Sequence, residues 1–116
     1  MSRRMNRVNV LLLQTISSVL ASDVRDPRLS ELITVTRVNT TPDLRDARVY
    51  VSILGDLDAK KKSVKALKSA SGFVRLKVRD MLDLKKIPTL HFKLDDSLEA
   101  GSNLINLISS VNPSET

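Results

Sequence analysis

Cysteine is absent from this chain of 116 residues, and glycine is scarce. Without cysteine the chain can form neither a disulfide framework nor a thiolate metal site, and a reducing cytoplasm is the compartment we expect. The three glycines, Gly55, Gly72 and Gly101, are too few and too widely spaced to form a phosphate-cradling loop or a dinucleotide-binding motif. Apolar runs fall short of the roughly 18 residues that a membrane-spanning helix needs, so we predict no membrane association.

Catalytic side chains are scarce as well. The single histidine, His91, falls on the outward face of a predicted strand, where a lone histidine is more often solvated than catalytic. The acidic pairs Asp56/Asp58 and Asp95/Asp96 could hold a hard cation, but each adjoins the end of a predicted element, where acids ordinarily cap helices. We therefore predict that the protein is not an enzyme and that it uses no metal, no cofactor and no small-molecule substrate.

The positive charge of the chain, a net +6, is unevenly distributed. All nineteen lysines and arginines lie at or before Lys93, together with nine of the thirteen acids. Residues 1–94 therefore carry a net charge of +10, and residues 95–116 a net charge of −4. A small domain with such an excess attracts polyanions, nucleic acid above all. The alternative is a lysine-rich surface that only keeps the protein soluble.

Residues 4–21 have the pattern of an amphipathic helix. Apolar side chains recur three or four residues apart and build one stripe for a core: Met5, Val8, Leu12, Ile16, Val19 and Leu20. Arg3, Arg4 and Arg7 lie at the first turn, where the helix dipole favours acids instead. These arginines indicate either an external anionic partner or a solvated terminus, and the sequence leaves both open.

Three β-strands are predicted. Residues 32–39 are rich in β-branched side chains, and residues 45–54 alternate between apolar and polar positions. Residues 40–43, Thr-Thr-Pro-Asp, are turn formers, so these two strands should form an antiparallel hairpin. Residues 89–95 also alternate. Because helical sequence precedes them, they should form a third strand that lies parallel to the second through a right-handed crossover.

The crossover, residues 59–84, contains eight lysines and arginines against two aspartates. Both of its halves have helical patterns, with Ser69, Ala70, Ser71 and Gly72 between them. Glycine and serine at such a position favour a kink or an end. We therefore predict two helices that meet at a sharp joint.

The predicted order is helix, strand, strand, helix, helix, strand (α-β-β-α-α-β), followed by a short C-terminal helix with an apolar face. This order makes an α+β fold in which a kinked helix pair packs on a three-stranded mixed sheet. Residues 1–111 should form a single domain and residues 112–116 a flexible C-terminal end. We expect the protein to be a monomer.

Aromatic residues are too few for one common mode of RNA recognition. Tyr50, Phe73 and Phe92 are the only aromatics, and Phe92 should point inward because of its place in the alternation. Modules that stack bases on a sheet need several exposed aromatic rings. Lysine and arginine instead contact phosphates without reading bases. Recognition should therefore depend on the shape of a folded RNA more than on its sequence.

The candidate RNA-binding residues are the cations of the first helix, of the crossover and of the segments beside it. They are Arg3, Arg4, Arg7, Arg45, Lys60, Lys61, Lys62, Lys65, Lys68, Arg75, Lys77, Arg79, Lys85 and Lys86. Two other functions remain open at this point: an adaptor that binds proteins through an exposed helix stripe and a sheet edge, and an RNA chaperone with no tie to ribosomes.

The order and spacing of several segments resemble the ribosome-binding factor A family, whose fold is a type II KH domain. The resemblance runs from about Arg3 to Ile108. The segments that carry it are Arg4 with Arg7, and residues 26–28, 35–38, 43–52, 69–75, 87–92 and 95–97.

The resemblance implies a function and a role for the joint. KH domains usually clamp nucleic acid with a Gly-X-X-Gly loop between two helices. This family has an interhelical kink instead, here Ala70, Ser71 and Gly72. By resemblance, the protein should bind the immature 30S ribosomal subunit and contact 16S rRNA near the decoding region. It should assist maturation of the 5′ end of that RNA and, in many bacteria, growth in the cold.

Overall fold

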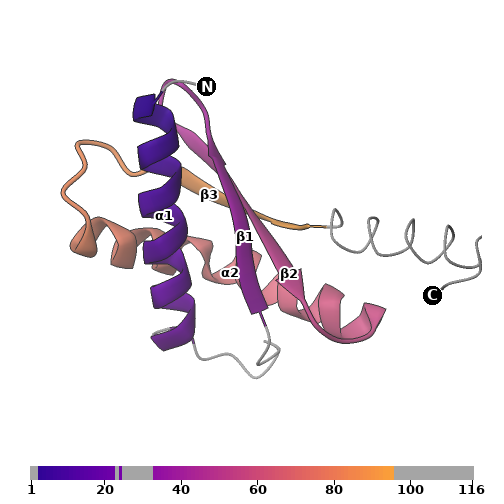
Figure 1. The fold of residues 1–116 in the computed structure, drawn as a ribbon. Helices are drawn as coiled ribbons and strands as arrows, with labels where there is room; N and C mark the ends of the chain where they lie inside the picture. Colours follow the sequence, from indigo (N-terminus) through magenta and orange to yellow (C-terminus); the bar gives the residue numbers. More distant parts are fainter. Residues whose placement is uncertain (1–2, 23, 25–32, 96–116) are drawn as a thin grey trace, which may run out of the picture.

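The structure, a computed structural model, describes residues 3–22, 24 and 33–95 of the chain (Figure 1). These described residues form two helices and three strands. They are α1 (Arg3–Ser22), β1 (Ile33–Thr40), β2 (Asp46–Ile53), α2 (Leu57–Met81) and β3 (Thr89–Leu94).

The strands form one mixed sheet in the order β1-β2-β3. β1 pairs with β2 antiparallel, with Val38 opposite Val49, and β2 pairs with β3 parallel, with Val49 opposite Phe92. The α+β class, the hairpin and the parallel third strand are thus confirmed. Because parallel neighbours cannot be joined by a tight turn, α2 carries the chain from one end of the sheet back to the other (Figure 1).

The core lies on one face of the sheet, which both helices cover. Every second residue of β2, beginning at Ala47 and ending at Ile53, is buried. The core side chains of α1 and α2 belong to the same cluster as those of the strands. Phe92 is the largest of the fully buried side chains, and it points inward as predicted. The opposite face of the sheet has no helix on it among the described residues.

A β-bulge changes the phase of β1. The pairing runs from Val35 opposite Val51 directly to Arg37 opposite Tyr50, so Thr36 is the extra residue. Strict alternation would place Val35 and Arg37 on the same face. The bulge instead buries Val35 and leaves Arg37 exposed. The Thr36 hydroxyl donates a hydrogen bond to the Asp95 carboxylate, which ties the bulge to the end of β3.

The predicted joint between two helices is wrong: α2 is one continuous helix of 25 residues, and Ala70, Ser71 and Gly72 lie inside it. A single helical glycine costs only about 1 kcal/mol relative to alanine, and this cost is local. Leu67 before the glycine and Val74 after it are both fully buried in the same core. The burial of these two side chains, one on each side of Gly72, therefore stabilises a continuous helix across the glycine.

Several predictions fall outside the described residues. They concern the connection at residues 26–28, the short C-terminal helix, the flexible end at 112–116 and hence the domain boundary at 111. That the protein is a monomer also stays a prediction. Within the described part of the chain, no helix is both long and apolar enough to cross a membrane.

Two glycine substitutions distinguish a continuous helix from a joint. A Cβ added at Gly72 meets nothing within 4 Å, so Gly72→Ala should raise the free energy of unfolding by about 1 kcal/mol in denaturant titrations. Gly55 has a φ of +142°, and its added Cβ would lie 3.0 Å from Ala59 Cβ. Gly55→Ala, the matched control, should therefore destabilise the protein. If Gly72→Ala destabilised the protein instead, the result would support a joint at Gly72 and contradict a continuous helix.

Candidate nucleic-acid interface

Thirteen of the fourteen predicted RNA-binding residues, all except Lys77, lie at three places. Arg3, Arg4 and Arg7 are exposed at the start of α1. A second group follows the first half of α2 and consists of Lys60, Lys61, Lys62, Lys65 and Lys68. A third group surrounds the connection from α2 to β3 and consists of Arg45, Arg75, Arg79, Lys85 and Lys86. The sequence-based prediction treated all of these residues as one binding surface, whereas the structure places them on three separate parts of the fold.

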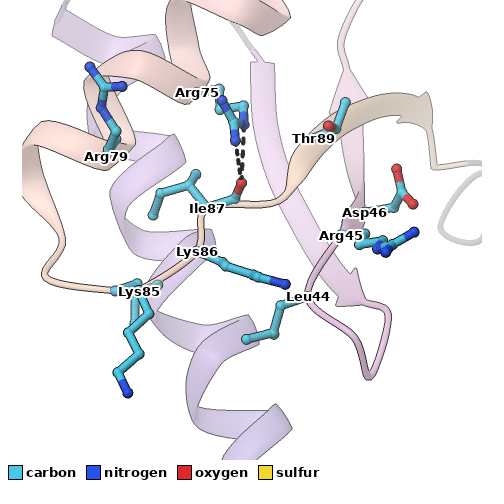
Figure 2. A pocket seen from close by; sticks show the side chains of 10 residues that line it. Leu44, Arg45, Asp46, Arg75, Arg79, Lys85, Lys86, Ile87 and Thr89 are labelled. Atoms are coloured by element: carbon cyan, nitrogen blue, oxygen red, sulfur yellow. Dashed lines mark hydrogen bonds between the residues drawn. The ribbon is translucent and has the colours of Figure 1, made fainter.

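The third group lines a hollow of about 670 Å³, which we call the basic groove (Figure 2). Its walls come from the turn between β1 and β2, the last turns of α2 and the chain that leads into β3. Five of the ten lining residues are lysine or arginine, and among them Asp46 is the only acid. In Figure 2, Lys86 extends in the direction of Leu44, whereas Lys85 points away from it.

Arg75 holds one wall of the basic groove in place. Its guanidinium donates hydrogen bonds to the carbonyl oxygen of Ile87, at 3.1 Å from Nε and 2.8 Å from Nη2 (Figure 2). Nε also donates to the carbonyl oxygen of Pro88 at 3.2 Å. Ile87 and Pro88 are themselves buried. Arg75 thus fastens the connection after α2 to the helix, and only the remaining N–H groups of its guanidinium can donate to a ligand in the groove.

A short hydrogen-bonded turn forms the opposite wall. The Asp43 carboxylate accepts from the Thr41 hydroxyl at 2.6 Å and from the Arg45 backbone N–H at 3.0 Å. These two hydrogen bonds, with the positive charge of Arg45, lower the pKa of Asp43. Leu44, between them, has a φ of +61°, a strained value for a bulky residue. The turn therefore fixes Leu44 and Arg45 at the edge of the groove.

The acids near the groove leave its positive charge largely uncompensated. Arg45 Nε lies 3.8 Å from the Asp43 carboxylate, but both side chains are mostly exposed, and such surface pairs are weak. Asp46 contacts His91 Nε2 at 2.7 Å. Arg45, Arg79, Lys85 and Lys86 are exposed and can contact an anionic ligand.

Other predicted residues do not join the basic groove. Lys77 Nζ lies over the ring of Phe73, 5.5 Å from its centroid, and neither side chain lines the hollow. The arginines of the first turn of α1 do not line it either. Ala70, Ser71 and Gly72 form no loop that could clamp a phosphate backbone, because they are helical.

Sequence reasoning missed a set of cations on the open face of the sheet. Arg37, Arg48 and Lys93 are exposed there, and the Arg37 guanidinium lies 4.0 Å from the centroid of the Tyr50 ring. The alternation of β2 and β3 would have revealed Arg48 and Lys93, since both follow inward-pointing residues. Arg37 could not have been placed, because the bulge at Thr36 decides its face.

The described residues include no cluster of three or more histidine and acidic side chains that could hold a metal ion. The arrangement can bind and position an anion, and the groove presents cations with no nucleophile or paired acids among its lining residues.

A comparison with protein families identifies the chain. The family model of ribosome-binding factor A matches residues 4–108. The chain belongs to the ribosome-binding factor A family. A relative from Acetivibrio thermocellus, a ribosome-binding factor A, is 42% identical over 105 residues, which are 90% of this chain and 85% of the relative. The family resemblance of the sequence is thus confirmed.

Solved structures of the family share the fold. The solution NMR structure of a Thermotoga maritima protein, a candidate ribosome-binding factor A, is 32% identical, with a TM-score of 0.73 over 85% of this chain and 93% of that one. A Thermus thermophilus ribosome-binding factor A, represented by a homology model fitted into a cryo-EM map of its complex with the 30S subunit, is 22% identical. Its TM-score is 0.63 over 76% of this chain and 91% of that one.

Removing the Arg75 guanidinium should cost stability. Arg75→Ala leaves the carbonyls of two buried residues without their charged donor, so we expect the free energy of unfolding to fall by about 2 kcal/mol in denaturant titrations. Arg79→Ala is the matched control, because Arg79 is an exposed arginine one turn further along the same helix and groove. It should change stability by less than about 0.5 kcal/mol. Equal effects of both substitutions would contradict the role of Arg75.

The turn at Asp43 predicts a pH dependence. Because the pKa of Asp43 is lower in the folded protein than in the unfolded chain, its contribution to stability is present above the unfolded pKa and is lost as the pH falls through the folded one. Asp43→Asn should therefore lower the free energy of unfolding at neutral pH. Its deficit relative to the unmodified protein should shrink below about pH 4. A deficit that stays constant across this range would exclude the charge of Asp43 as the cause.

Proposed function

We propose that this protein binds the immature 30S ribosomal subunit in the cytoplasm and contacts 16S rRNA through the basic groove. The observation that carries the proposal is that Arg45, Arg79, Lys85 and Lys86 all line one hollow. Membership of the ribosome-binding factor A family and the complex of a Thermus thermophilus member with the 30S subunit support the choice of partner.

The groove suits phosphates better than bases. Arg45, Arg79, Lys85 and Lys86 are exposed, and they come from three separate segments, so they can contact phosphates that a folded RNA brings close together. Contacts of lysine and arginine with phosphate, made by charge and hydrogen bonding, carry no information about base sequence. Recognition through this groove therefore selects the shape of the RNA backbone.

Exposed aromatic rings are too few for stacking on single strands. Phe92 is buried, and the Tyr50 ring has the Arg37 guanidinium over it. Phe73 is 44% exposed and has Lys77 near its face. Base stacking on a sheet needs several free rings. Folded rRNA is the better ligand for this surface.

In the proposed mechanism the protein neutralises phosphates of an immature rRNA junction and holds that junction until it matures. It leaves when the mature RNA no longer fits the groove. No covalent step is required. By holding the junction, the protein assists maturation of the 5′ end of 16S rRNA and assembly of the subunit. Assistance of this kind matters most in the cold, where misfolded RNA rearranges slowly.

Charge reversal within the groove tests the proposal. Lys85→Glu combined with Lys86→Glu should weaken association with purified immature 30S subunits. The salt slope of the affinity should also become shallower by about 2, because two phosphate contacts are lost. Arg48→Glu with Lys93→Glu, on the open face of the sheet, is the control with the same change in net charge. Association is measured by sedimentation at several salt concentrations.

Three results would contradict the proposal. Equal losses for both double variants would assign binding to net charge alone. An affinity that does not respond to salt would indicate a protein contact, as in an adaptor. Equal competition by an unrelated folded RNA would indicate a general RNA chaperone. Circular dichroism of each variant checks that its fold is intact.

A further inference from the structure

Another hollow, of about 340 Å³, lies between the first half of α2 and the end of β3. We call it the lysine-rimmed groove. Its apolar lining consists of Leu57 and Val64 from α2 and Leu94 from β3. Its cationic lining consists of Lys60, Lys61, Lys65 and Lys68. The α2 residues recur three or four positions apart, so they form one stripe along the helix.

The chemistry of this groove differs from that of the basic groove. Leu57 is 62% exposed, and Val64 and Leu94 are only half-buried, although they also contact the core. Single exposed apolar residues are ordinary, but here three surround one hollow and four lysines border it. RNA phosphates would contact the lysines and leave the apolar lining exposed. A ligand that is both apolar and acidic would match the two parts together.

The chain itself contains a segment of this composition. Residues 96–116 carry three acids, Asp96, Glu99 and Glu115, and no lysine or arginine. Four of their apolar side chains recur at helical spacing: Leu104, Leu107, Ile108 and Val111. The sequence pattern is therefore that of an amphipathic helix with acids near its two ends, and such a segment fits an apolar groove with a cationic border.

Position and length also favour this segment. Leu94 is both a lining residue of the groove and the last residue of β3, so residues 96–116 begin two residues from the groove. Such a short tether gives the segment a high effective concentration at the groove. The groove extends along α2 from Leu57 to Lys68, about 16 Å of helix, and residues 98–111 in helical form would span about 20 Å.

We infer that residues 96–116 dock intramolecularly in the lysine-rimmed groove. Leu104, Leu107 and their apolar neighbours would cover Leu57, Val64 and Leu94, with the acids beside the lysines of the border. This inference depends on the fold and on the composition of the segment, and it does not depend on the binding of rRNA.

Paramagnetic broadening in NMR spectra of the full chain tests the inference. Because the chain has no cysteine, Ser109→Cys carries a single nitroxide spin label and leaves every lysine of the groove unchanged. The amides of residues 57–68 should lose most of their intensity, whereas those of residues 5–19 in α1 should keep theirs. Adding Leu104→Asp and Leu107→Asp to the same labelled chain should restore the intensity of residues 57–68.

Three outcomes would overturn the inference. Intact intensity at residues 57–68 would mean that the segment does not reach the groove. Broadening that survives both aspartate substitutions would mean that its apolar side chains do not hold it there. Broadening that appears only when spin-labelled chains are mixed with isotope-labelled ones would mean that a second copy fills the groove.

Discussion

The parallel pairing of β2 with β3 is the constraint on which the rest of this structure depends. Parallel neighbours must be joined by a crossover, and in this chain the crossover is the 25-residue helix α2 with its connection to β3. The core, the basic groove and the lysine-rimmed groove all include side chains of this helix or of its ends. Arg75 fastens the connection from α2 to β3 to the helix, and this connection forms one wall of the basic groove.

Continuity of α2 gives the two grooves a fixed relation. A joint at Gly72 would have let the two halves of the helix tilt independently. A single helix of 25 residues, about 37 Å long, instead holds a polar cationic groove near one end and a partly apolar one along its first half. One element thus presents two surfaces of different chemistry, one suited to RNA phosphates and the other to an acidic amphipathic segment.

Sequence patterns predicted most of the fold because its strands are buried on one face only. Alternation in residues 46–53 and 89–94 indicated which side chains enter the core, and it correctly predicted that Phe92 points inward. Three features had no such signal. The bulge at Thr36 depends on pairing with β2, and helix continuity at Gly72 depends on burial to either side. The role of Arg75 depends on carbonyls twelve and thirteen residues away, so its sequence context indicated only a positive charge.

The place of Phe92 in the chain has a consequence for folding during synthesis. Phe92 is the largest fully buried side chain, and it belongs to β3, the last described element. During synthesis α1, the β1–β2 hairpin and α2 leave the ribosome before β3. At that stage the sheet has only two strands, and the core lacks the Phe92 side chain. Non-local parallel pairing also forms slowly. The domain can therefore close only after residue 94 has emerged, and until then its apolar helix faces are exposed to other chains.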